Sequence, residues 1–171
     1  MNRTRKTLLA VAGVVAAVST LTTTEALAGT TKDAASQVPP ALDARMNGTW
    51  ETTVELSDAP PGAPASFSAL DTFVPGGGLL VSSSAPGPAG RTLAHGTWTH
   101  TGHRQFTSTF VWFRFDGTGA CVGTQQVQRT MHLSRSRARF QATDVIEIIS
   151  PTGAVVATIH GTEVGRLLTD G

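Results

Sequence analysis

Apolar and polar residues alternate along most of the chain from about residue 48 onward. This period of two is typical of β-strands that bury one face. In the first run, for example, Trp50 and Val54 alternate with Glu51, Thr53 and Glu55. Clusters of Gly, Pro, Asp and Ser separate the runs and predict turns. The eight strands predicted in this way are Gly48–Leu56, Ser66–Val74, 79–84, 91–100, 103–115, Cys121–Leu133, 137–149 and Val155–Leu167.

Several connections between these runs are short turns, and short turns join antiparallel neighbours. The segments 75–78, 116–119 and 150–153 contain glycines that accept the positive φ angles of hairpin turns. Eight strands of this length suffice to close an up-and-down barrel, which leaves no exposed sheet edge. No segment has the pattern of a long amphipathic helix. The sequence therefore predicts an all-β fold, an eight-stranded antiparallel up-and-down barrel, with a two-sheet sandwich as the alternative.

The N-terminus has the pattern of a secretory signal peptide. Basic residues in segment 2–6 precede an apolar run over 7–21, and the small-x-small triplet Ala26-Leu27-Ala28 follows. A retained membrane anchor is the alternative, but the run is short and no basic patch follows it. We expect cleavage after residue 28, a flexible leader over 29–45, a barrel domain over 46–171, and secretion as a freely released extracellular protein.

Composition and charge exclude several classes of protein. The formal net charge is +1 and only 15% of residues are charged, without a dense group of Lys or Arg, so nucleic acid is not an expected partner. The hydrophobic fraction of 40% is too high for a disordered chain. No apolar run beyond the signal is long enough to span a bilayer, so no membrane association is expected after its removal. Cys121 is the only cysteine, which rules out an intramolecular disulfide.

The triplet Gly48-Thr49-Trp50 opens the first predicted strand, and Arg166 stands near the end of the last one. This pairing resembles the lipocalins and the wider calycin group, and the chain is most similar to a bacterial calycin-like barrel. The resemblance implies that Gly48, Trp50 and Arg166 are structural, with the Arg packed across the indole that closes the barrel. A second triplet, Gly96-Thr97-Trp98, indicates either an internal repeat or a coincidence.

The face of segment 137–149 that contains Phe140 and Ile146 is apolar except for Asp144. A carboxylate inside a barrel needs a partner, and Arg129 and His160 on the neighbouring strands are the candidates. Alternatively, a β-bulge turns this carboxylate toward water.

Segment 103–115 is apolar on both faces in its second half. Phe110 and Trp112 share one face, whereas Val111, Phe113 and Phe115 share the other. One set can fill the barrel, and the other needs a cover, which the leader, a loop or a second subunit can provide. A homodimer is therefore a possible assembly.

The leading functional hypothesis is a secreted, cofactor-free, lipocalin-like protein that binds a small apolar or amphiphilic molecule. Small inward residues on neighbouring strands leave room for it. The expected ligand-binding residues are Trp98, Phe110, Trp112, Phe140 and Ile146.

Two other functions remain open. The chain also resembles the small eight-stranded barrels of the allene oxide cyclase type, which implies a cofactor-free cyclase or isomerase. Confinement of the substrate would supply the catalysis, with Asp144, Arg129 and Gln125 as candidate catalytic residues. The third possibility is an extracellular interaction module with a filled barrel. The five histidines do not converge on an expected metal site.

Overall fold

The computed structural model describes residues 44–169. The expected signal peptide and almost all of the expected leader lie outside the described residues. Among the residues described, no helix is long and apolar enough to cross a membrane.

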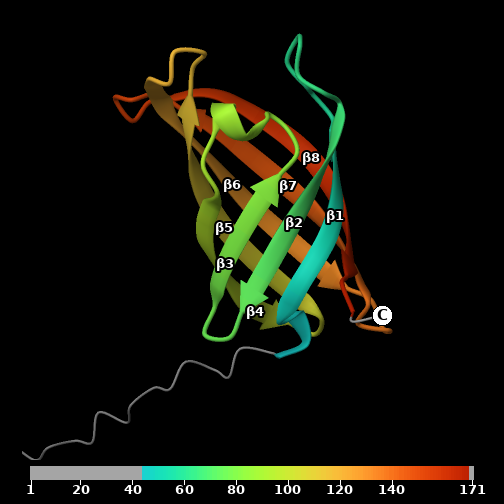
Figure 1. The fold of residues 1–171 in the computed structure, drawn as a ribbon. Coiled ribbons are helices and arrows are strands. Elements are labelled where there is room, and N and C mark those ends of the chain that lie inside the picture. The colour runs from blue at the N-terminus through green and yellow to red at the C-terminus, as the bar shows by residue number, and fades with distance from the viewer. Residues whose placement is uncertain (1–43, 170–171) are drawn as a thin grey trace, which may run out of the picture. The chain divides into compact units, whose positions relative to one another are not determined.

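Eight strands and two short 3-10 helices make up this part of the chain (Figure 1). The 3-10 helices are η1 (Ala44–Met46) and η2 (Pro88–Gly90). The strands are β1 (Gly48–Leu56), β2 (Ser66–Val74), β3 (Gly78–Ser83), β4 (Ala94–Gly102), β5 (Gln105–Phe115), β6 (Cys121–Leu133), β7 (Arg139–Ile149) and β8 (Val155–Leu167).

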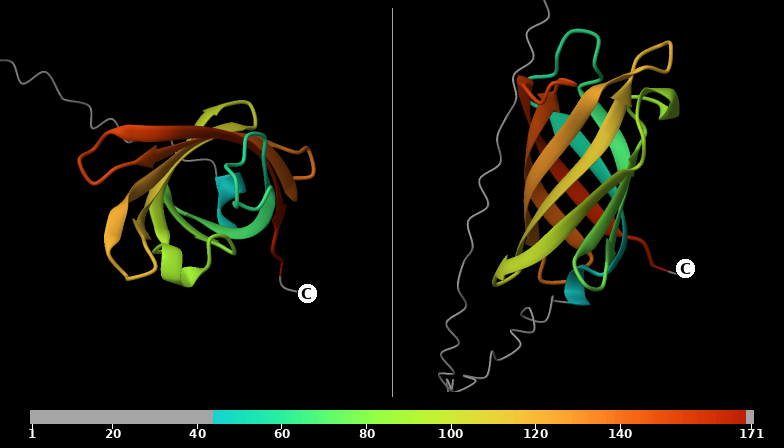
Figure 2. Two further views of the ribbon diagram at one scale, coloured as in Figure 1. Left: turned by 90° about the horizontal axis from the view of Figure 1, so that it is seen from above. Right: turned by 90° about the vertical axis from the view of Figure 1, so that its left-hand side faces the viewer.

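Every strand pairs antiparallel with the next one in the sequence, and β8 pairs with β1, so the sheet closes into a barrel. The closing register brings Trp50 opposite Leu167 and Leu56 opposite Gly161. Seen from above, the strands surround a single axis (Figure 2). The predicted eight-stranded antiparallel closed barrel is confirmed, and the sandwich alternative is wrong.

The strand ends differ from the prediction where the backbone leaves the extended region. Arg104 and Arg137 have φ angles of 58° and 60°, so β5 and β7 begin after these turn residues. Strand β4 begins at Ala94 rather than at residue 91, because Arg91 makes only an isolated bridge to Arg114. This departure places Arg91 at one end of the barrel, beside the loop that joins β3 to β4.

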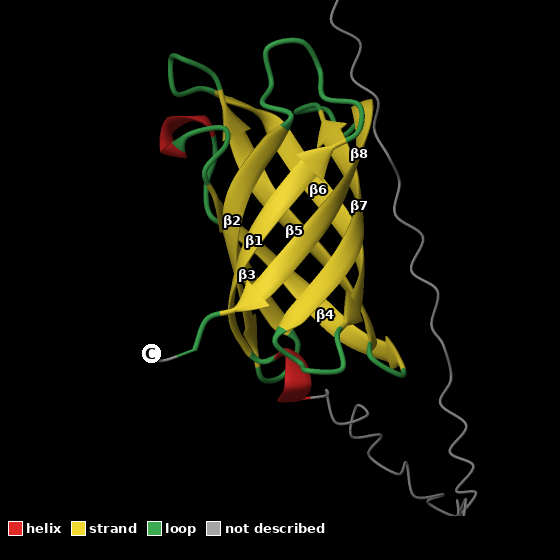
Figure 3. Ribbon diagram, turned by 90° about the vertical axis from the view of Figure 1, so that its right-hand side faces the viewer, coloured by secondary structure: helices red, strands yellow, loops and turns green. Residues whose placement is uncertain are grey.

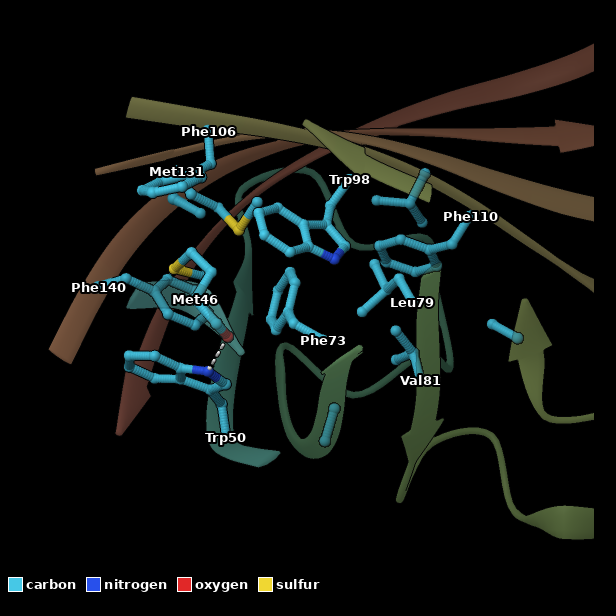
Figure 4. Close-up of a cluster of buried hydrophobic side chains, with 14 of the residues drawn as sticks. Met46, Trp50, Phe73, Leu79, Val81, Trp98, Phe106, Phe110, Met131 and Phe140 are labelled. Atoms are coloured by element: carbon cyan, nitrogen blue, oxygen red, sulfur yellow. Dashed lines mark hydrogen bonds between the residues drawn. The ribbon is translucent and has the colours of Figure 1, made fainter. Parts of the chain in front are cut away.

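The other end of the barrel is closed by a cluster of large apolar side chains (Figure 4). η1 lies beneath this end (Figure 3) and contributes Met46, which is fully buried. The indole Nε1 of Trp50 donates to the carbonyl of Met46 at 3.0 Å, and the ring lies 5.2 Å from that of Phe140. Phe73 joins Phe140 to Trp98 by edge-on contacts. Both Gly-Thr-Trp triplets therefore deliver their indoles to one cluster.

Gly165 makes room for this cluster. A Cβ atom at this position would lie 2.1 Å from the ring of Phe140. We expect Gly165→Ala to lower the free energy of unfolding by about 1–3 kcal/mol, because the ring must leave its position in a packed core. Chemical denaturation measures the change. Gly117→Ala is the matched control, since a Cβ at Gly117 meets nothing within 4 Å. Equal stability of the two variants would contradict the packing assigned to Phe140.

Candidate functional site

The inward side chains of β7 show how the barrel interior changes along its length. Phe140 and Ala142 belong to the closed end, Asp144 follows, and Ile146 and Ile148 lead to the open end. The interior thus has a packed aromatic part, a charged part and an open part. The charged and open parts contain the candidate functional groups.

The charged part is built around Arg129, whose side chain is only 2% exposed. Its Nε donates to Oδ1 of Asp144 at 2.9 Å. Its Nη1 contacts Oδ2 of Asp71, and its Nη2 contacts Oε2 of Glu163. The guanidinium carbon lies 4.9 Å from the centre of the Phe110 ring. Each guanidinium nitrogen therefore faces one carboxyl group, and the flat face of the guanidinium packs on an aromatic ring. Asp71, Arg129, Asp144 and Glu163 are called the charged cluster below.

One guanidinium cannot neutralise three buried carboxylates. Burial raises the pKa of Glu163 well above its usual value; Arg129 opposes this shift, and the nearby Asp71 and Asp144 reinforce it. Burial also raises the pKa of Asp71, again against the effect of Arg129. Burial alone would lower the pKa of Arg129, but the three carboxyl groups hold it above the usual value. The cluster therefore keeps Arg129 charged and favours a proton on Glu163.

Two of the four residues of the charged cluster, Asp144 and Arg129, were predicted from the sequence. Of the two candidate partners of Asp144, the structure pairs it with Arg129. The bulge alternative is wrong, because the register between β6 and β7 is unbroken. His160 is not the partner: it lies on the outside, with its Nδ1 3.1 Å from Oδ2 of Asp58. Asp71 was missed, although it alternates with the buried residues of β2 and so had the same signal as Asp144. Glu163 was missed too, and it lies on the buried face of β8.

The open end of the barrel holds a cavity of about 440 Å³. The loop between β1 and β2 and the loop between β3 and β4 border it. Its apolar lining includes Leu56, Phe67, Pro86, Ile146, Ile148 and Ile159. Its polar lining includes Asp58, Arg91, Arg114, Gln125 and Thr158.

Arg91 stands out in this lining because it is only 8% exposed. The chain around it is fixed to β5: the Thr92 amide donates to the Phe113 carbonyl, and the Phe113 amide donates to Oγ1 of Thr92, both at 3.1 Å. The guanidinium carbon lies 4.3 Å from the centre of the Trp112 ring. Within residues 44–169, the buried Nη2 atom has no hydrogen-bond partner. Burial lowers the pKa of Arg91 to about 10, so the side chain stays charged at neutral pH.

The residues expected to bind a ligand are divided between the three parts of the interior. Trp98 and Phe140 pack in the closed end. Phe110 lies against Arg129, and Trp112 lies against Arg91. Ile146 lines the cavity. The four aromatic residues among them are buried in the apolar core, and none of the four is among the residues that line the cavity at the open end.

The candidate catalytic residues are separated as well. Gln125 lines the cavity, whereas Arg129 and Asp144 are buried in the charged cluster and are absent from the lining. Within residues 44–169, no group of three His, Cys, Asp or Glu side chains is arranged to hold a metal ion.

Comparison with known protein families, curated proteins and solved structures finds no match to this chain. The description as an eight-stranded antiparallel barrel therefore rests on its own strand pairing. One contact implied by the lipocalin resemblance does not form. Arg166 is exposed on the outer face and binds Oε2 of Glu51 through Nη2 at 2.7 Å, instead of crossing the indole of Trp50. The physical reason is strand alternation, because Gly165 and Leu167 on either side of Arg166 face inward.

Proposed function

We propose that this protein binds a small amphiphilic molecule in the cavity at the open end of the barrel. The observation that carries the proposal is the cavity of about 440 Å³, which has apolar walls and is bordered by Arg91, whose buried Nη2 atom has no hydrogen-bond partner among the described residues. Ligand pockets usually span about 300–1,000 Å³ and combine apolar walls with a few orienting polar groups. The signal-like N-terminus supports a further part of the proposal, that binding takes place outside the cell.

The walls support binding without large rearrangement. Leu56, Ile146, Ile148 and Ile159 come from three strands of a closed sheet. Ile146 and Ile159 are opposite each other in the pairing of β7 with β8. The filled aromatic end holds these strands together from below. A ligand therefore meets a wall that is already in place, which lowers the entropic cost of binding.

Filling the cavity tests the proposal. We expect Ile159→Trp to weaken binding of an uncharged apolar fluorescent probe, such as N-phenyl-1-naphthylamine, at least about tenfold, since the indole would occupy the ligand's volume. Fluorescence titration of the purified protein measures the affinity. Val156→Trp is the matched control, because Val156 lies on the same strand and is 63% exposed. Absence of saturable probe binding to the unmodified protein, or equal binding by both variants, would refute a binding role for the cavity.

The catalytic alternative has no specific observation in its favour, because the three candidate residues do not meet at one accessible place. A homodimer stays a prediction: Phe113 is 56% exposed on the outer face of β5, as the sequence pattern indicated. No contact among the described residues identifies what covers it.

A further inference from the structure

We propose that Arg91 receives the anionic head group of the ligand, and that the ligand is a carboxylate with a single apolar tail. This inference rests on the proposed binding function and specifies its ligand class. The supporting observation is an unpaired charge. Arg91 is a buried cation that borders the cavity, and it forms no ion pair with an acidic side chain in the described part of the chain.

A buried charge without a partner is unfavourable, and proteins usually pair such a charge. The guanidinium of Arg91 has one packed face and one unpaired donor atom. One face is occupied by the ring of Trp112 at 4.3 Å, while the Nη2 atom is buried without an acceptor. The stacking contact holds the planar group in one orientation and leaves the donors of Nη2 for a ligand.

A second cation, Arg114, lies in the same lining. Arg114 lies opposite Arg91 in an isolated antiparallel bridge, and both side chains line the cavity. Like charges at opposed positions repel each other unless an anion lies between them. The one acidic residue in the lining, Asp58, is engaged elsewhere: Oδ1 accepts the backbone amide of His160 at 2.6 Å, and Oδ2 lies 3.1 Å from the His160 ring. The negative charge that the two arginines need must therefore come from outside this lining.

The apolar character of the remaining lining favours a carboxylate over a phosphate monoester. A carboxylate matches the planar fork of an arginine and carries one charge. The walls beyond Arg91 are mainly apolar, with Ile148 and Ile159 among them, and they favour an uncharged tail. A doubly charged phosphate monoester would bring a second charge next to these walls, which is costly to desolvate. A monocarboxylate with an alkyl tail fits both ends of the cavity.

The test compares ligands that share one tail. Decanoate, 1-decanol and decyl sulfate are titrated against the uncharged probe bound to the purified protein at neutral pH. We expect decanoate to bind about 10- to 100-fold more tightly than 1-decanol, the range for a charge-assisted hydrogen bond. Arg91→Met is expected to abolish this preference by weakening decanoate binding far more than 1-decanol binding. Arg91→Lys, which keeps the charge but loses the planar fork, should retain only part of the preference.

Arg166→Met is the matched control, since it removes the same charge from an exposed position at the closed end, and it should keep the preference. Circular dichroism and a cooperative thermal unfolding transition show whether a variant at Arg91 is folded; if Arg91→Met does not fold, Arg91→Lys decides. Equal affinities for decanoate and 1-decanol, tighter binding of decyl sulfate, or a preference that survives both Arg91 variants would overturn the head-group assignment and leave the binding proposal intact. Absence of saturable probe binding would overturn both proposals, and a bound probe that none of the three ligands displaces would overturn the head-group assignment.

Discussion

Replacing Arg129 with methionine is expected to lower the free energy of unfolding by about 3–5 kcal/mol, the range seen when one partner of a buried ion pair is removed. The variant keeps much of the side-chain volume but leaves Asp71, Asp144 and Glu163 without a cation. All three carboxyl groups are almost completely buried, so water cannot replace the guanidinium. Thermal and urea denaturation at neutral pH measure the loss.

The control for this prediction is Arg166→Met. Arg166 also pairs with a carboxylate, Glu51, but both side chains are more than half exposed. Exposed pairs contribute about 0–1 kcal/mol, so the control should differ little from the unmodified protein. A loss below about 1 kcal/mol for Arg129→Met would mean that the charged cluster does not hold the barrel together.

The second prediction concerns pH. The folded state raises the pKa of Glu163, so folding takes up a proton. The stability that depends on this proton is complete below the ordinary pKa of a glutamate, and it is lost as pH rises toward the raised folded-state pKa. Glu163→Gln mimics the protonated group at every pH. We expect the stability of this variant relative to the unmodified protein to increase with pH above about 4.5, by up to about 1.4 kcal/mol per pH unit.

Denaturation of both proteins between pH 4 and pH 8 provides the measurement, and the difference between them cancels titrations outside the cluster. Asp71→Asn should produce a difference of the same sign, since burial raises the pKa of Asp71 as well. A difference that stays constant over this range, or that falls with rising pH, would show that Glu163 is ionised in the folded protein.

The strand pattern and the barrel could be predicted because alternation is a local property. The alternation around Trp50 and Val54 indicates which face of β1 is buried, and the short turns indicate which strands are neighbours. Asp144 was recognised as unusual for the same reason. The pairing with Arg129 followed from the adjacency of β6 and β7.

The full charged cluster, the position of Arg91 and the choice of the filled end could not be predicted. They depend on contacts across the barrel and on the local path of the chain, which alternation does not show. Asp71 reaches Arg129 from a strand 58 positions away in the sequence. Arg91 faces the cavity because the chain leaves the sheet between η2 and β4, although the residue types there continue a strand pattern. Which end of the barrel is filled depends on how rings such as Phe73 and Phe106 pack together, and that packing is not visible in alternation.

The charged cluster lies between the aromatic end of the barrel and the residues that line the cavity. The ion pairs of Arg129 and the aromatic end provide much of the buried packing that holds the fold. The side chains that would select a ligand, such as Ile148 and Ile159, lie above the charged cluster and are only partly buried. Under the proposed function, selection on ligand preference and selection on stability would act on different residues. If the barrel binds a ligand as proposed, substitutions in its upper half would change what it binds while the ion pairs and the aromatic end stay the same. The open end would then be a suitable starting point for redesigned specificity.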